Sequence, residues 1–284
     1  MKTNISFSIP TYNRKKVLKK CLLSIANYKW KHPVEVVIAD GGSTDGTIEF
    51  LKKFDKKNKV AMNIIEQNEL MGIIKSMDVC FRAAKGEYVM VLNDDCIIVP
   101  KVIDELCSFM DTYKQMAIGG TKQTHHGKHI FPYVISNNIL PGFIGANFPI
   151  VRREVLSKLG FSDTNTEFNN AFGISFLENG YTFAFHKDVG IHHMIVNDEH
   201  KKISHDSIKA DTKYLVDKHA ELRAKVRRCL GNEAVNASIA ANNDGSHRNF
   251  TEERLERIRL FYDPEFPKDV GFMHLHQRFD GCML

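Results

Sequence analysis

The stretch EYVMVLNDD at residues 87–95 decides the fold, because it joins an apolar strand to a polar turn. The run of apolar and aromatic residues within 87–92 is typical of a strand buried on both faces of a parallel sheet. Asp94 and Asp95 follow at its carboxyl end, and the segment 100–113 has helical spacing with a proline at its start. The stretch therefore predicts a strand that ends in a carboxylate turn and passes into a helix.

The same alternation of strand, polar turn and helix precedes this stretch. Strands are expected at residues 5–9, 34–39 and 60–65, and helices at 14–28, 47–54 and 72–84. This pattern predicts a doubly wound, mostly parallel α/β sheet, in which ligands bind at the carboxyl ends of the strands. The turns at 10–14, 40–45 and 93–95 should therefore converge on one crevice.

The pattern changes beyond residue 115. Short strands are expected at 129–135, 144–151 and 181–185, around an amphipathic helix at about 168–179. Past residue 200 the charged sequence predicts helices at 201–230 and 251–262. We therefore expect one domain at residues 1–199 and a helical C-terminal extension at 200–284, and the pattern leaves open whether the extension packs on that domain.

The composition is that of an ordinary globular protein. The 284 residues include 39 Lys and Arg against 34 Asp and Glu, and this mild excess suits a phosphorylated ligand without requiring one. No nucleic-acid-binding motif accompanies the charge. The six cysteines form no CxxC pair, so we interpret them as reduced thiols of a cytoplasmic protein. No apolar run approaches the roughly 20 residues that cross a bilayer, whereas peripheral attachment at the inner face of a membrane stays open.

The three turns carry side chains suited to an anionic ligand. The first turn, at 10–14, precedes a helix N-terminus, which attracts anions, although an ordinary loop would look the same. Asp40 could accept a hydrogen bond from the N–H of a base, or it could be a turn or cap residue. Asp94 and Asp95 would repel each other unless a divalent cation or solvent relieves the repulsion. Hard carboxylate oxygens suit Mg²⁺ or Mn²⁺ held jointly with phosphates.

The ordered motifs resemble the large family of inverting GT-A glycosyltransferases commonly called family 2. The matching segments are SIPTYNR at 8–14, VVIADGGSTDGT at 36–47, QN at 67–68 with Gly72, AKGEYVMVLNDD at 84–95, GANFPIVRRE at 145–154, LGF at 159–161, ENGY at 178–181 and HH at 192–193. Their order and spacing match over about residues 5–195. The resemblance implies a GT-A fold and a metal-dependent transfer of sugar, with inversion, from a nucleotide-diphosphosugar, most often a uridine one, to an acceptor hydroxyl.

The resemblance also implies roles for individual residues. The nucleotide would be bound by Pro10, Thr11, Tyr12, Arg14, Asp40, Gly41, Lys75, Asn93 and Asp94. A divalent cation, Mn²⁺ or Mg²⁺, would be held chiefly by Asp95, and His192 or His193 matches a downstream histidine that lies near the diphosphate or the metal. The acceptor would be a glycan, a lipid-linked molecule or a protein.

Three positions depart from the family's pattern. The acidic pair that usually precedes the Gly-Tyr pair is replaced by FNNA at 168–171, so the nearest candidates for the catalytic base are Glu167 and then Asp163, which could also be solvated loop acids. The usual Asp-Asp-Gly-Ser is DGGS at 40–43, and Asn93 stands where an acid is common. One alternative is therefore a nucleotide-sugar-binding domain without transfer activity. A nucleotidyltransferase is another, although SIPTYNR lacks the glycine-rich, basic signature expected of one.

Overall fold

A computed structural model of the chain describes residues 5–57, 60–112, 114, 116–125, 128–130, 133–135, 144–146, 148–159, 182–194, 196 and 272–275. Its strands are β1 (Ile5–Thr11), β2 (Val34–Asp40), β3 (Ala61–Glu66), β4 (Tyr88–Val91), β5 (Cys96–Ile98), β6 (Met116–His125), β7 (Lys128–Ile130), β8 (Tyr133–Ile135), β9 (Ile144–Ala146), β10 (Ile150–Arg152), β11 (Thr182–His193) and β12 (Phe272–Leu275). Its helices are α1 (Lys15–Ala26), α2 (Thr47–Lys57), α3 (Ile73–Ala83), α4 (Pro100–Thr112) and α5 (Arg153–Leu159).

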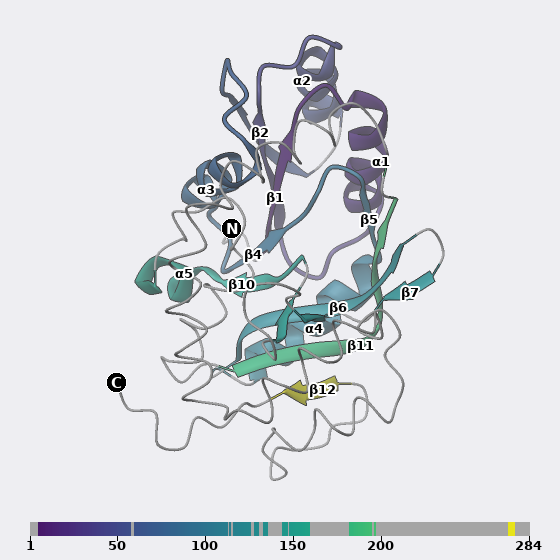
Figure 1. The fold of residues 1–284 in the computed structure, drawn as a ribbon, viewed down its shortest axis with the longest axis vertical. Helices are drawn as coiled ribbons and strands as arrows, with labels where there is room; N and C mark the ends of the chain where they lie inside the picture. Colours follow the sequence, from purple (N-terminus) through teal and green to yellow (C-terminus); the bar gives the residue numbers. More distant parts are fainter. Residues whose placement is uncertain are drawn as a thin grey trace.

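The strands form one mixed sheet and a separate hairpin (Figure 1). The main sheet has the order β12-β11-β6-β10-β4-β1-β2-β3, with β5 paired to β11 and β7 paired to β6, and β8 pairs with β9 alone. The pairs β1–β2, β2–β3, β1–β4 and β6–β11 are parallel, whereas β10 runs antiparallel to both of its neighbours. The predicted α/β plan with a mostly parallel, doubly wound N-terminal half is confirmed.

The register of the first strands brings their carboxyl ends to one edge. Thr11 at the end of β1 lies opposite Asp40 at the end of β2. On the other side of β1, Ser8 lies opposite Val91 in β4, and its carbonyl accepts the N–H of Leu92 at 3.1 Å. The polar turns after β1, β2 and β4 therefore begin beside one another, as the sequence predicted.

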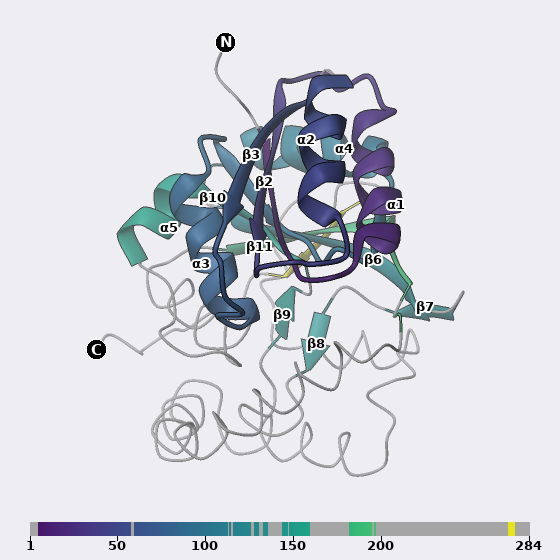
Figure 2. The ribbon, with the colours of Figure 1, turned by 90° about the horizontal axis from the view of Figure 1, so that it is seen from above.

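Helices cover both faces of this half of the sheet, which is why β1 is buried along its whole length. Figure 2 shows α1 and α2 on one side of β1, β2 and β3, with α3 and α5 on the other. Helix α1 buries residues at helical spacing, Leu18, Cys21, Leu22 and Ile25. Each large apolar side chain so buried contributes roughly 1.5–3 kcal/mol, and the resulting core fixes the position of the turns above it.

The second half of the chain differs from the prediction. The expected strand at 129–135 is divided into β7 and β8, and the one at 144–151 into β9 and β10. Strand β6 was not predicted, because its two glycines and its polar end lack the apolar run of a buried strand. Strand β11 extends well beyond the expected 181–185 and reaches His193. Its extra length matters, because its carboxyl end reaches the candidate site.

The C-terminal extension is described at one place, β12, which pairs antiparallel with β11. This strand was not predicted, and it shows that the extension contributes to the main sheet. The helices expected at 168–179, 201–230 and 251–262 lie outside the described residues, so the domain boundary near residue 200 stays a prediction.

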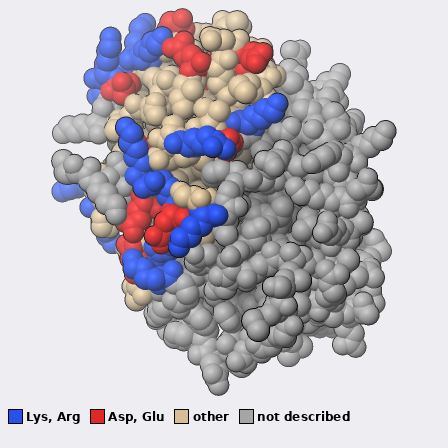
Figure 3. Space-filling model, turned by 90° about the vertical axis from the view of Figure 1, so that its left-hand side faces the viewer, with Lys and Arg blue, Asp and Glu red and all other residues tan. Residues whose placement is uncertain are grey.

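The surface of the described residues is charged with both signs. Figure 3 shows one face on which Lys and Arg side chains are interleaved with Asp and Glu. On the described part of this face the basic excess is therefore not gathered into one patch. No helix within the described ranges combines the length and the apolar content that crossing a membrane requires.

Candidate functional site

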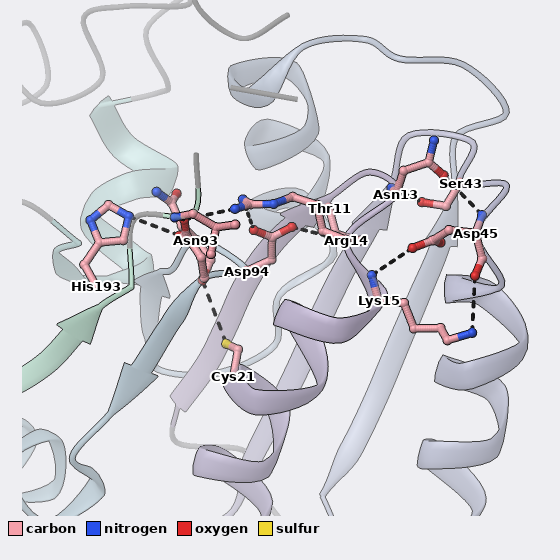
Figure 4. A network of polar contacts seen from close by, with 12 residues as sticks. Thr11, Asn13, Arg14, Lys15, Cys21, Ser43, Asp45, Asn93, Asp94 and His193 are labelled. Atoms are coloured by element: carbon pink, nitrogen blue, oxygen red, sulfur yellow. Dashed lines mark hydrogen bonds and ion pairs between the residues drawn. The ribbon is translucent and has the colours of Figure 1, made fainter. Parts of the chain in front are cut away.

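The turns after β1 and β2 are tied together by side chains that bond to backbone (Figure 4). Asn13 has a left-handed backbone with φ of 51°, and its Oδ1 accepts the N–H of Thr44 at 2.6 Å. Its own N–H donates to Ser43 Oγ at 2.7 Å. Asp45 accepts the N–H of Thr47, at the start of α2, and the N–H of Lys15, at the start of α1, both at 3.0 Å. These hydrogen bonds hold the two turns and the two helix N-termini together at one edge of the site.

The two aspartates after β4 are held by residues of the first turn. Thr11 Oγ1 donates to Asp94 Oδ2 at 2.8 Å. The Arg14 guanidinium bridges both carboxylates, with 2.5 Å to Asp94 Oδ1 and 3.1 Å to Asp95 Oδ2. Asp94 and Asp95 are only 4% and 5% exposed, so their charges depend on these partners rather than on water.

Strand β11 brings a histidine to the same carboxylates. His193 lies opposite Cys96 of β5, directly after Asp95, and its Nε2 is 3.1 Å from Asp95 Oδ1. The ring of Phe148 packs edge-on against the imidazole, with centroids 5.1 Å apart. His192, the next residue along the strand, is exposed, and its Nδ1 is 2.7 Å from Thr124 Oγ1. The structure therefore brings His193 to Asp95 and directs His192 to another contact.

A group of three residues here could hold a metal ion. One ligand atom each from Asp95, Cys96 and His193 lies within 4.8 Å of the others. Burial raises the pKa of the Cys96 thiol well above its ordinary value, which favours the protonated form over the thiolate that binds metals. Sequence reasoning named the aspartate and the histidine and missed Cys96, whose signal was its position next to Asp95.

The charge of Asp95 is stabilised by the fold. Burial alone would raise its pKa, but the contacts with His193 and Arg14 outweigh burial and lower the pKa from 3.8 to about 2. A carboxyl group whose pKa is lower in the folded state stabilises the fold above its unfolded pKa. That stabilisation is lost as the pH falls through the folded value.

We expect the free energy of unfolding to fall between about pH 4 and pH 2 by about 2 kcal/mol on account of Asp95. Urea unfolding of the wild type and of Asp95→Asn, followed by circular dichroism from pH 5 to pH 2, measures this contribution. The difference between the two proteins should narrow as the pH falls. A difference that stays constant across this range would contradict the assignment of the charge to Asp95.

Asp40 has one occupied and one open oxygen at the end of β2. Its Oδ1 accepts the N–H groups of Gly42 at 3.1 Å and Ser43 at 2.8 Å. Its Oδ2 is buried and receives no hydrogen bond from any described residue. A buried carboxylate oxygen in that state is costly unless a ligand donor reaches it, so Asp40 is both a turn residue and a candidate acceptor.

The wall beside Asp40 is formed by residues of two other turns. A Cβ atom on Gly41 would lie 3.1 Å from Leu70 Cδ1 and 3.5 Å from the Tyr12 ring, so the missing side chain gives them room. Leu70 is 46% exposed. Gly42 has φ of 86°, which favours glycine, and a Cβ there would meet the carbonyl oxygen of Asn68 at 3.1 Å. Close packing at this turn explains why glycines follow Asp40.

The other residues singled out in the sequence lie around this edge or outside the described ranges. Pro10 is buried in β1, and Lys75 is exposed in the first turn of α3. The backbone carbonyl of Asn93 accepts the N–H of Cys96 at 3.2 Å, and this bond closes the turn that contains Asp94 and Asp95. Glu167 and Asp163 lie outside the described residues.

Comparison with known proteins assigns the chain to a family. The family model described as glycosyl transferase family 2 matches residues 6–176, more than half of the chain. The chain belongs to glycosyl transferase family 2. The resemblance inferred from the ordered motifs is thus confirmed.

Curated relatives of this family 2 chain are glycosyltransferases of several bacteria. It is 30% identical over 109 residues to the poly(ribitol-phosphate) beta-N-acetylglucosaminyltransferase TarS of Staphylococcus aureus, a match covering 38% of this chain and 19% of TarS. It is 28% identical over 121 residues to the abequosyltransferase RfbV of Salmonella typhimurium, covering 42% and 36%. The chain therefore spans well under half of the length of these relatives.

Solved structures share the fold of this family 2 chain. TarS 1–349 of S. aureus in complex with UDP-GlcNAc has a TM-score of 0.62 at 19% identity, covering 91% of this chain and 80% of that one. The mannosyltransferase PcManGT of Pyrobaculum calidifontis, in complex with GDP-Man and Mn²⁺, has a TM-score of 0.59 at 16% identity, covering 92% and 79%. At these identities the likeness establishes the GT-A fold.

Proposed function

We propose that the chain is a metal-dependent glycosyltransferase that moves a sugar from a UDP-sugar to an acceptor hydroxyl with inversion. The observation that carries this proposal is the convergence, at one edge of the sheet, of the open Asp40 oxygen with the paired carboxylates Asp94 and Asp95 and with His193. Membership of family 2 supports the reaction class, and relatives that are named transferases support it further.

The state of Asp40 supports a uridine nucleotide. With Oδ1 occupied by two backbone N–H groups, a single oxygen is left for the base. Uracil presents one ring N–H, whereas guanine presents two neighbouring N–H donors, which fit a carboxylate with both oxygens available. Tyr12 and Leu70, at the space left by Gly41, would flank the base, and Pro10 and Thr11 would lie beneath the nucleotide.

The donor atoms at Asp94, Asp95 and His193 fit a divalent cation. Carboxylate oxygens are ligands that Mg²⁺ and Mn²⁺ prefer, and Asp95 Oδ1 receives no hydrogen bond from the described residues beyond its contact with His193. Such a cation would neutralise the charge that develops on the leaving diphosphate. Asp95 would be the principal ligand, with His193 beside it. His192, turned to Thr124, is left out of the proposed ligand set.

The chain's own residues would hold the donor and move one proton. Arg14 would attract the diphosphate, with Lys75 at the first turn of α3 and Asn93 beside the ribose. Glu167, or failing that Asp163, would accept the proton of the acceptor hydroxyl as it attacks the sugar carbon from the face opposite the diphosphate. A single displacement of this kind inverts the configuration at that carbon.

The replacement of the usual acidic pair by FNNA at 168–171 favours a second candidate, a domain that binds the nucleotide sugar without transferring it. Transfer to an acceptor, or hydrolysis of the donor, would exclude it. The acceptor would be a glycan, a lipid-linked molecule or a protein. The buried free thiols Cys21, Cys80, Cys96 and Cys107 suit a reducing compartment, so we place the protein in the cytoplasm, with attachment to a membrane face left open.

Thermal unfolding with nucleotides tests the proposed donor site. We expect UDP to stabilise the protein only when Mn²⁺ or Mg²⁺ is present, because the paired carboxylates tolerate a diphosphate only with a cation between them. At a UDP concentration about 100 times its dissociation constant, the gain should be about 2.7 kcal/mol. GDP at the same concentration is the matched control and should give a smaller shift. A panel in which no nucleotide produces a metal-dependent shift would overturn the proposal.

A further inference from the structure

We propose that Arg14 couples the binding of the cation to the binding of the nucleotide, by holding the same two carboxylates that the cation needs. The inference rests on the proposed function, because it takes Asp94 and Asp95 as the cation's ligands. It goes beyond that function in stating that the two ligands bind cooperatively and which residue couples them.

The carboxylate oxygens are already engaged by the chain. Asp94 has Thr11 on one oxygen and Arg14 on the other. Asp95 has Arg14 at 3.1 Å on Oδ2, together with the more distant N–H of Val196 at 3.4 Å, and His193 on Oδ1. Figure 4 shows Arg14 and Thr11 beside Asp94, so a cation that binds here must share or displace contacts of Arg14.

The charges make this displacement unfavourable for a cation alone. The Arg14 side chain is 15% exposed, and its planar guanidinium fits between two carboxylates in a way that a point charge does not. A divalent cation added beside it would repel the guanidinium at short range and turn the net charge of the group from negative to positive. Breaking the pair without another anion would forfeit two charge-assisted contacts of a largely buried guanidinium.

A diphosphate removes this obstacle. Arg14 directly precedes α1, where Asp45 already accepts the N–H of Lys15, so the partly exposed guanidinium is the group that a diphosphate would contact here. A diphosphate at that position gives the guanidinium a new bidentate partner as it releases Asp94 and Asp95 to the cation. The two ligands therefore bind cooperatively, and the cation enters most favourably together with the nucleotide. By linkage, each should strengthen the binding of the other by the same factor.

The test compares Mn²⁺ binding to the wild type, Arg14→Gln and Arg14→Lys, with and without UDP. Electron paramagnetic resonance of free Mn²⁺ measures binding directly and needs no enzyme activity. We expect Arg14→Gln to bind Mn²⁺ alone about tenfold more tightly than the wild type, and UDP in the presence of Mn²⁺ about tenfold more weakly. The factor by which UDP strengthens Mn²⁺ binding should accordingly fall by tenfold or more.

One control variant and the conservative variant Arg14→Lys make the result specific. Arg82→Gln removes the same charge from an exposed position on α3 and should leave both affinities unchanged. Arg14→Lys keeps the charge but loses the fork that spans both carboxylates, so its values should fall between those of the wild type and Arg14→Gln. Arg14→Lys also replaces Arg14→Gln in the test if the latter fails to fold, because Arg14→Lys should still bind Mn²⁺ alone more tightly than the wild type does.

The outcomes separate this inference from the proposed function. If UDP and Mn²⁺ bind the wild type together but the Arg14 variants bind Mn²⁺ alone no more tightly, Arg14 merely contacts the nucleotide and the coupling is overturned. If Mn²⁺ binds none of the proteins even with UDP present, the proposed function fails and the inference fails with it.

Discussion

Asp95→Asn is expected to lower the rate of sugar transfer by about 10²–10³-fold, the equivalent of several kcal/mol of lost charge stabilisation. The variant keeps the shape of the side chain but removes the charge that faces Arg14 and His193. Cation binding should be lost together with transfer. Release of UDP from the best of a panel of UDP-sugars, at saturating Mn²⁺, measures the rate. Full activity in Asp95→Asn would show that the crevice has been misplaced.

Asp40→Asn is the matched control, because it makes the same chemical change at the end of β2, which β1 separates from β4. Its amide oxygen can still accept the N–H groups of Gly42 and Ser43, so the turn should keep its shape. Its NH₂ group would face the N–H of uracil, and because both groups are donors they cannot form a hydrogen bond. UDP affinity should fall by about 10- to 100-fold, which is the worth of a hydrogen bond to a charged group, while Mn²⁺ still binds. Equal and negligible effects of both substitutions would contradict the site.

Glu167→Gln should lower transfer by about 10²–10⁴-fold and leave donor binding unchanged, because a positioned general base is worth about that much. Glu167 is expected to open the helix that in relatives presents the acidic pair, and its longer side chain makes up one residue of displacement. A helix N-terminus would keep the carboxylate ionised and ready to accept a proton. Transfer and UDP affinity, measured on the same preparation, separate a catalytic loss from a binding loss.

Asp163→Asn is the control for the base. If this variant loses transfer while Glu167→Gln keeps it, the assignment is wrong and Asp163 is the base. Full activity in both variants would place the base elsewhere, at His125, at His126 or in the C-terminal extension.

The N-terminal half of the fold was predictable because its signals are local. Strands such as β1, β2 and β4 are short apolar runs bounded by polar turns, and their helices place apolar residues at helical spacing. The meeting of Asp40 with the turn after β4 followed from one rule, that the carboxyl ends of parallel strands share an edge. The placement of these two turns at the same edge of the sheet could thus be predicted without knowing how distant segments pair.

The rest depended on pairings between distant segments. The choice between His192 and His193 is made by the register of β11 against β5, which places His193 opposite Cys96 and leaves His192 to Thr124. No local pattern fixes such a register. Likewise, nothing in the sequence of the first turn indicates that the Arg14 guanidinium spans two carboxylates some 80 residues away.

The pairing of β12 with β11 has a consequence for the folding of the protein during its synthesis on the ribosome. Roughly 80 residues separate these strands, and at 5–20 residues per second their synthesis takes about 4–16 s. For that time the outer edge of β11 lacks this partner, and an unpaired edge can associate with another nascent chain. The end of β11 that carries His193 pairs with β5 instead, so the histidine can reach Asp95 before β12 is made.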